Sequence, residues 1–302
     1  MKSKLSISRI IFFAILLAPI SAFSADGDIL RTIIAERTGT ACQSTDPEGN
    51  HSSINVGIAF DGTNLLVSCY GDNTVSFIDP ADGSQLEVHN ITNASILGAL
   101  AWDNGRGLLW ACSASSTIGT IDLATDIFTP VFTGECFDGL AYDASDDTIW
   151  ASADATWPIS HYMTDGTPLG DYFQPSGWSG AGNSGIAVGG QNLYMANNGS
   201  SQIYVVDKAV TSASLFATLD RRQEGLECDN ITFDGLGKNA IWTIDAYDNV
   251  LNALEIPIGS CSFGGGVDLP STPVPFMSRW ATIAVFMLLV LFAYGHFRRR
   301  VN

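Results

Sequence analysis

The chain has 302 residues, of which 31 are acidic and 14 basic, so its formal net charge at pH 7 is −17. All 31 acidic residues lie between Asp26 and Asp268 with only seven basic ones among them, which gives this part of the chain a net charge of −24. That charge argues against nucleic acid or an anionic membrane surface as a partner, because phosphate groups would be repelled. It is compatible with cations and with neutral glycans.

Residues 1–24 have the three parts of a secretory signal peptide. Ile10–Leu17 is an unbroken apolar run, and Ala22 and Ser24 place small residues where a signal peptidase cleaves. The alternative, an uncleaved membrane helix, requires a longer apolar run than this one. The positively charged region before the run contains three basic residues: Lys2, Lys4 and Arg9.

Residues 25–266 are predicted to form one domain, because a five-residue phrase recurs along them. The phrase occurs at Gly57–Asp61, Ala99–Asp103, Gly139–Asp143, Gly185–Gly189 and Asn230–Asp234. The last residues of successive phrases are 42, 40, 46 and 45 positions apart. Short strands in repeats of this length are typical of the blades of a β-propeller. The fold class is therefore all-β.

Further apolar runs follow each phrase. The second runs are Leu65–Ser68, Leu108–Ala111, Thr148–Ala151, Leu193–Ala196 and Ala240–Thr243. A third, alternating run comes next, and a weaker fourth one, such as Gln85–His89, follows it. In two repeats, Leu65–Asp79 and Leu193–Asp207, the strand, Asn/Gly turn and strand ending in Asp resemble the YVTN/NHL class of propellers. The resemblance implies the fold, whereas function is not implied because propellers host many activities.

Five blades are predicted, closed by a strand from the N-terminus. The fifth repeat has no further strand after about Ile256, and an isolated strand-like stretch, Ile29–Ala35, precedes the first repeat. If this stretch completes the last blade, the ring closes without a free sheet edge. Six blades remain an alternative if the segment from Cys42 to Ile54 contributes more than a loop.

Six cysteines, all within residues 25–266, suit an oxidising compartment and up to three disulfides. The sequence leaves the connectivity open among 15 pairings. Our preferred pairing joins Cys42 to Cys261 across the two ends of the fold. Cys69 and Cys112 occupy equivalent repeat positions and would pair between neighbouring blades. The two remaining cysteines are Cys136 and Cys228.

Four polar residues just before or at the start of the phrases are candidates for a ligand or metal site: Asp138, Asn183, Glu227 and Asp229. Innermost propeller strands begin near one mouth of the central channel, so these side chains would converge there. Their oxygens would suit Ca²⁺, which binds about six to eight oxygen ligands. Alternatively, the same side chains cap strand ends and face water. No complete set of residues for nucleophilic catalysis is present, and Trp157 and Trp178, in irregular Gly/Ser/Pro-rich stretches, are candidates for stacking on sugars.

The C-terminus carries a linker at residues 267–279, an apolar helix at residues 280–297 and a basic tail at residues 298–302. The helix would be about 27 Å long, enough to cross a membrane, and the positive-inside rule places everything before it outside the cytoplasm. This arrangement resembles the IPTL-CTERM sorting tail, a relative of the PEP-CTERM tails. Phe276, Met277 and Arg279 depart from the family pattern. The matching residues are Val274, Pro275, Ser278, Trp280, Arg298, Arg299 and Arg300.

The sorting-tail resemblance implies processing by an exosortase-like membrane protease and display at the cell surface. The sequence therefore predicts a membrane-anchored or surface-displayed propeller that acts as a non-catalytic binding or scaffold module in the bacterial envelope or extracellular matrix. Its partner would be a glycan or an envelope protein. The alternative is a divalent-metal-dependent hydrolase of the lactonase or esterase kind, with its site at the channel mouth.

Overall fold

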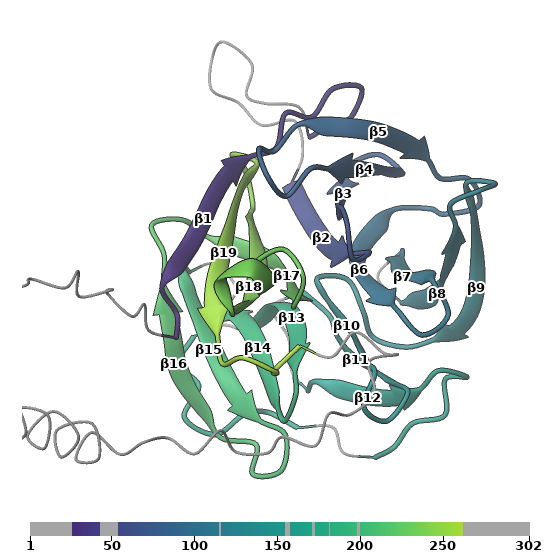
Figure 1. Ribbon diagram of the computed structural model, residues 1–302. Coiled ribbons are helices and arrows are strands. Elements are labelled where there is room, and N and C mark those ends of the chain that lie inside the picture. Colours follow the sequence, from purple (N-terminus) through teal and green to yellow (C-terminus); the bar gives the residue numbers. More distant parts are fainter. Residues whose placement is uncertain are drawn as a thin grey trace, which may run out of the picture. The chain divides into compact units, whose positions relative to one another are not determined.

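The computed structural model describes residues 26–42, 54–114, 116–154, 158–170, 173–180, 182–197 and 200–261. Their strands form five antiparallel sheets arranged around a common centre (Figure 1). The predicted signal peptide, sorting motif, membrane helix and basic tail lie outside the described residues. Among the described residues, no helix is long and apolar enough to cross a membrane.

The first two blades each have four strands. The first blade contains β2 (Ile54–Phe60), β3 (Leu65–Tyr70), β4 (Thr74–Ile78) and β5 (Gln85–Asn90). The second blade contains β6 (Leu97–Asp103), β7 (Leu108–Ser113), β8 (Thr117–Asp122) and β9 (Ile127–Thr133). The strands predicted after the first two phrases are thus confirmed.

The other three blades follow in chain order. The third blade contains β10 (Gly139–Asp143), β11 (Thr148–Ser152) and β12 (Ser160–Met163). The fourth contains β13 (Asn183–Gly189), β14 (Asn192–Asn197), β15 (Gln202–Asp207) and β16 (Ala213–Thr218). The fifth contains β17 (Gln223–Asp229), β18 (Asn239–Asp245), β19 (Val250–Ile256) and β1 (Ile29–Ile34).

The N-terminal strand closes the ring, as the sequence predicts. β1 is the outermost strand of the fifth blade and pairs antiparallel with β19, with Ile33 opposite Leu251. One sheet therefore combines the first and last strands of the propeller, which leaves β1 rather than β19 as its outer edge (Figure 1). The number of blades is five.

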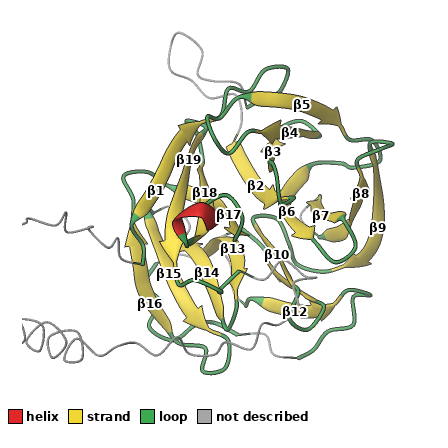
Figure 2. Ribbon diagram, in the orientation of Figure 1, coloured by secondary structure: helices red, strands yellow, loops and turns green. Residues whose placement is uncertain are grey.

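The core lies between blades, where apolar side chains of one sheet pack on those of the next. One cluster joins the fifth blade to the first and includes Phe60, Trp242 and Leu251, each fully buried. The only helix among the described residues is a single 3₁₀ turn, Asp234–Leu236, which follows β17 (Figure 2). Packing between sheets is therefore what holds the ring together.

The fifth phrase predicted from the sequence is wrong. Asn230–Asp234 forms the loop that leads into the 3₁₀ turn and the first residue of that turn. The inner strand of the fifth blade is β17, which begins at Gln223, seven residues before Asn230. The true fifth phrase is Gly225–Asp229, which ends 40 residues after Gly189. Glu227 and Cys228 disguise it, because they stand where the other phrases have alanine and a large apolar residue.

The preferred disulfide pairing is also wrong, although all six cysteines are bonded. The three disulfides have Cα–Cα distances of 5.6–5.8 Å and join Cys42 to Cys69, Cys112 to Cys136, and Cys228 to Cys261. Cys42 cannot reach Cys261 because β1 and β19 are antiparallel, so the chain leaves these strands at opposite ends of the blade. Cys69 and Cys112 lie on neighbouring sheets, which pack about 10 Å apart, too far for a disulfide.

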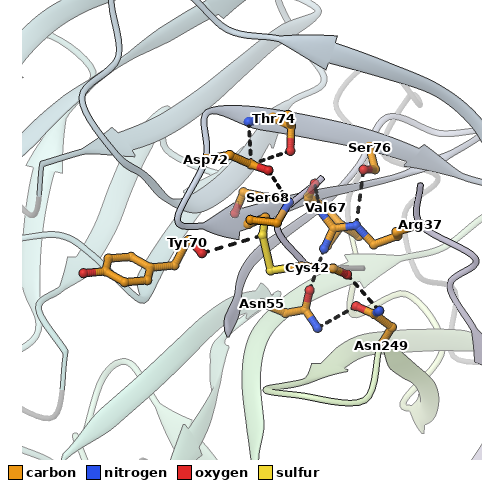
Figure 3. The surroundings of a disulfide bond; sticks show 12 residues. Arg37, Cys42, Asn55, Val67, Ser68, Tyr70, Asp72, Thr74, Ser76 and Asn249 are labelled. Atoms are coloured by element: carbon orange, nitrogen blue, oxygen red, sulfur yellow. Dashed lines mark hydrogen bonds between the residues drawn. A yellow bond between two sulfur atoms is a disulfide. The ribbon is translucent and has the colours of Figure 1, made fainter. Parts of the chain in front are cut away.

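A buried arginine accompanies the disulfide that follows β1 (Figure 3). The Arg37 guanidinium donates hydrogen bonds to Asn55 Oδ1 at 2.5 Å and to Ser76 Oγ at 3.2 Å. Asn55 in turn donates to Asn249 Oδ1 at 2.9 Å, and Asn249 donates to the carbonyl of Cys42 at 3.0 Å. Burial lowers the pKa of Arg37 to about 10. These bonds connect the closing segment to the first and fifth blades, so they serve the ring closure.

Candidate functional site: the two ends of the central channel

The five inner strands, β2, β6, β10, β13 and β17, surround a narrow channel, and each contacts the inner strand of the next blade. Glycine permits this approach near the strand starts. A Cβ atom on Gly185 would lie 1.9 Å from the carbonyl oxygen of Glu224, and one on Gly57 would lie 2.6 Å from that of Gly98. The inner strands therefore approach one another closely there, and polar side chains lie at both ends of the channel.

The end where the inner strands begin, named here the Asp138 end, holds three carboxyl groups, those of Asp138, Asp154 and Glu224. Asp138 and Glu224 are buried, with 4% and 1% of their surface exposed, and the side chains of Asp138 and Asp154 are hydrogen-bonded to each other. Glu224 accepts a hydrogen bond from Ser184 Oγ and forms an ion pair with Arg222 Nε at 2.5 Å. Arg222 thus places a cation in contact with the carboxyl group of Glu224.

The pKa values of two of these carboxyl groups, those of Asp138 and Glu224, are raised. Burial raises the pKa of Asp138 to about 9, and the charges of Glu224 and Asp154 add to the rise. Burial also raises the pKa of Glu224 to about 7, although the hydrogen bond from Ser184 and the charge of Arg222 favour its ionised form. Asp138 is therefore protonated at neutral pH, and Glu224 exchanges its proton near neutrality.

Asn183 lies at the same end, but in a structural role. Its side chain is buried and hydrogen-bonded to Ser152 Oγ at 2.6 Å, which connects the fourth blade to the third. Asp229 lies at the far end of β17. Its carboxylate accepts hydrogen bonds from the backbone N–H groups of Ile231 and Thr232 and from Trp242 Nε1 at 2.7 Å. Asp229 therefore fixes a turn and a core tryptophan.

The end where the inner strands finish, named here the Glu227 end, contains a small recess of about 30 Å³ that is partly open to solvent. Glu227 lines the recess, and its carboxylate accepts a hydrogen bond from the backbone N–H of Cys228 at 2.8 Å and others from the backbones of Phe60 and Trp102. Burial raises the pKa of Glu227 to about 8 in spite of these bonds. The residue at the fourth position of each phrase also lines the recess, in all five blades: Phe60, Trp102, Tyr142, Val188 and Cys228.

The four predicted site residues do not share one mouth. Asp138 and Asn183 lie where inner strands begin, whereas Glu227 and Asp229 lie in the second half of β17. The prediction of convergence is wrong for the set because the fifth phrase was placed five residues too late in the chain. In the part of the chain that the structure describes, no three His, Cys, Asp or Glu side chains form a group that could hold a metal ion.

The sequence prediction missed Glu224, and a signal for it existed. Asp138, Ser184 and Glu224 each precede a glycine followed by Leu or Ile, so they are repeat-equivalent. Arg222 and Asp154 carry no such signal, since they lie in connections between strands. Trp178 packs its ring on Tyr204 at a centroid distance of 4.5 Å, and Trp157 lies outside the described residues.

No known protein family matches the sequence, and no curated protein is similar to it. Solved structures do match. The glutaminyl cyclase of Myxococcus xanthus aligns with a TM-score of 0.54 and 14% identity, over 76% of this chain and 97% of that one. A structural genomics protein of unknown function from Bacteroides thetaiotaomicron aligns with a TM-score of 0.48 and 16% identity, over 66% and 58% of the two chains. At such identities the likeness concerns the propeller fold alone.

Proposed function

We propose that this protein is an exported propeller, held at the membrane or displayed at the surface by its C-terminal segment, that acts as a non-catalytic binding or scaffold module of the bacterial envelope or extracellular matrix. The observation that carries the proposal is the state of the cysteines, since all six are joined in disulfides. Structural disulfides persist in oxidising compartments and are rare in the cytosol. This agrees with the secretory signal expected at residues 1–24.

The construction of the ring supports a binding role. β1 pairs with β19 and so joins the first strand of the propeller to the last blade, and Arg37 ties the segment that follows β1 to the first blade. Two disulfides also tie a strand to a neighbouring connection, Cys42 to Cys69 and Cys112 to Cys136. A braced ring of this kind presents its loops in fixed positions, which lowers the entropy lost when a partner binds.

The partners are a sorting protease of the exosortase kind and, for the propeller, a glycan or an envelope protein. The first rests on the resemblance of residues 274–300 to a sorting tail. The second rests on the net charge of −24 between Asp26 and Asp268, which disfavours polyanions. Residues 280–297 would anchor the chain in the membrane before processing.

The test is expression of the full chain in a Gram-negative host, beside a variant that lacks residues 1–24. We expect the full chain outside the cytoplasm with residues 1–24 removed and no free thiol, and the variant in the cytosol with reduced cysteines. Purified protein should then bind saturably to cell-wall sacculi or to members of a glycan array. A full chain that stays in the cytosol with its N-terminus intact would overturn the proposal.

A second candidate function is proton-transfer catalysis at the Asp138 end. The observation that favours it is that a buried carboxyl with a pKa of about 7, Glu224, lies beside a protonated one, Asp138. General acid–base catalysis is most effective when the pKa lies near the working pH. One structural neighbour is a glutaminyl cyclase, so a peptide with N-terminal glutamine belongs in the substrate screen, with Glu224→Gln as the inactive variant.

The metal-dependent hydrolase remains an alternative to be tested in the same screen. Two of its proposed ligands, Asp138 and Glu227, line opposite ends of the channel, so the ligand set predicted from the sequence would need other members. Hydrolysis of a lactone or an ester that depends on added Ca²⁺ would favour this alternative. Saturable binding without turnover, in Ca²⁺ or in chelator, favours the binding module.

A further inference from the structure

Glu227 occupies the third position of its phrase, where the other four phrases have alanine. The third residue of the other four phrases is Ala59, Ala101, Ala141 or Ala187, and each is at most 5% exposed. Glu227 is only partly buried, and an ionisable side chain in such a position costs free energy unless something compensates its charge. The fifth blade therefore departs from the repeat at one point, and that point lies in a recess on the channel axis.

The hydrogen bonds that Glu227 accepts offset only part of the cost of burying its charge. A carboxylate has about four lone-pair sites, and backbone N–H groups of three residues, Phe60, Trp102 and Cys228, donate to this one. These donors favour the ionised form, yet burial still raises the pKa to about 8. A cation bound beside Glu227 would therefore favour the ionised carboxylate and lower its pKa again.

The walls of the recess suit an organic cation. Trp102 and Tyr142 line it and are only partly buried, and aromatic faces attract ammonium and guanidinium groups. A hard metal ion would need more oxygen ligands than the single carboxylate of Glu227 and the amide of Asn104 supply. The Arg106 guanidinium lies 3.4 Å from the Tyr142 hydroxyl but is paired with Asp103 and Asp147.

We propose that the recess formed by Glu227, Trp102 and Tyr142 binds the head group of an organic cation, an alkylammonium or guanidinium group. The cation is either a free small molecule or the tip of a lysine or arginine side chain of another protein. The site rests on the proposed binding function and names its ligand class. The acidic charge of residues 26–268 would attract such ligands to the ring.

The test is titration of the full-length protein with methylguanidinium and with tri-arginine amide, with the neutral isostere methylurea as the control ligand. We expect binding of at least one cation and none of methylurea. Glu227→Gln should weaken the binding at least tenfold, and Trp102→Leu by about three- to fivefold. Glu87→Gln, which removes a largely exposed carboxylate on β5, should leave it unchanged. Thermal melts establish that each variant is folded.

Each outcome is decisive. Binding of methylguanidinium alone identifies a free ligand, and binding of the peptide alone identifies a partner side chain. Cation binding that survives in folded Glu227→Gln, or no binding of either cation to the wild-type protein, overturns the proposal. Binding to sacculi or glycans that persists in Glu227→Gln would show that the binding module uses another surface, so the two proposals fail separately.

Discussion

The two ends of the channel accommodate carboxyl groups in different ways. At the Asp138 end, burial and the charges of neighbouring carboxyls raise the pKa of Asp138 and Glu224, and Arg222 contacts Glu224. At the Glu227 end, one carboxylate receives backbone N–H bonds and faces a recess with aromatic walls. The first arrangement stores protons, whereas in the second a carboxyl of raised pKa would ionise when an outside cation binds beside it.

The difference follows from the narrowing of the ring. Near the strand starts, neighbouring backbones approach so closely that Gly185 is required, so polar groups there contact one another. Near the strand ends, the residues at the fourth phrase position line a recess that is partly open to solvent. A charged group at this end can therefore meet a ligand.

Removal of the disulfide at the Glu227 end should have the largest effect. Cys228 and Cys261 line the recess and are 33 residues apart, so the double substitution Cys228→Ser, Cys261→Ser should lower the free energy of unfolding by about 4 kcal/mol through loop entropy. Denaturant melts measure this. It should also weaken cation binding, because the recess loses part of its wall.

The matched control is Cys42→Ser with Cys69→Ser, which opens a loop of 27 residues far from the recess. Its loss of stability should be similar, and its cation binding unchanged. Equal loss of binding in both double variants would show that the two regions are not distinct.

The next largest loss of stability is expected from a methyl group added at the Asp138 end. Gly185→Ala places a Cβ atom 1.9 Å from the backbone oxygen of Glu224, so neighbouring inner strands must separate. We expect a loss of about 3 kcal/mol in denaturant melts. Gly235→Ala, where no atom lies within 4 Å of the new Cβ, should change stability by less than about 0.5 kcal/mol. A Gly185→Ala protein as stable as its control would contradict the narrow channel.

At the Asp138 end we expect a gradual change of stability with pH, at most about 1.4 kcal/mol per pH unit, because of the proton held there. The pKa of Asp138 rises from 3.8 to about 9 on folding, so between these values the folded protein binds a proton that the unfolded chain releases. Stability should therefore fall as pH rises through this window. Asp138→Asn, which cannot ionise, should make the dependence shallower in melts between pH 5 and pH 9.

Asp82→Asn serves as the control for that measurement. Hydrogen bonds from Ser84 lower the pKa of this fully exposed carboxyl, so its contribution changes only in acid, below the window. An Asp138→Asn protein with the same pH dependence as wild type would show that the Asp138 end is not a store of protons.

The local sequence pattern was sufficient to predict the ring of blades, but it did not predict which residues lie together at each end of the channel. The runs after each phrase became strands because period-two alternation and turn residues act over a few positions. The fifth phrase failed because Glu227 and Cys228 broke the apolar pattern, and a better apolar match, Ile231 and Phe233, stood nearby. Glu227 and Cys228, which depart from the repeat, therefore hid the strand that carries them.

The sequence by itself determined an all-β propeller of five repeats closed by an N-terminal strand, because repeat length and strand alternation are properties of neighbouring residues. Tertiary structure alone decided which cysteines pair, since antiparallel pairing of β1 and β19 sends Cys42 and Cys261 in opposite directions. The tertiary structure also decided which carboxyl groups lie at each end of the channel. Both outcomes depend on where distant segments meet in space, and no spacing along the chain encodes that distance.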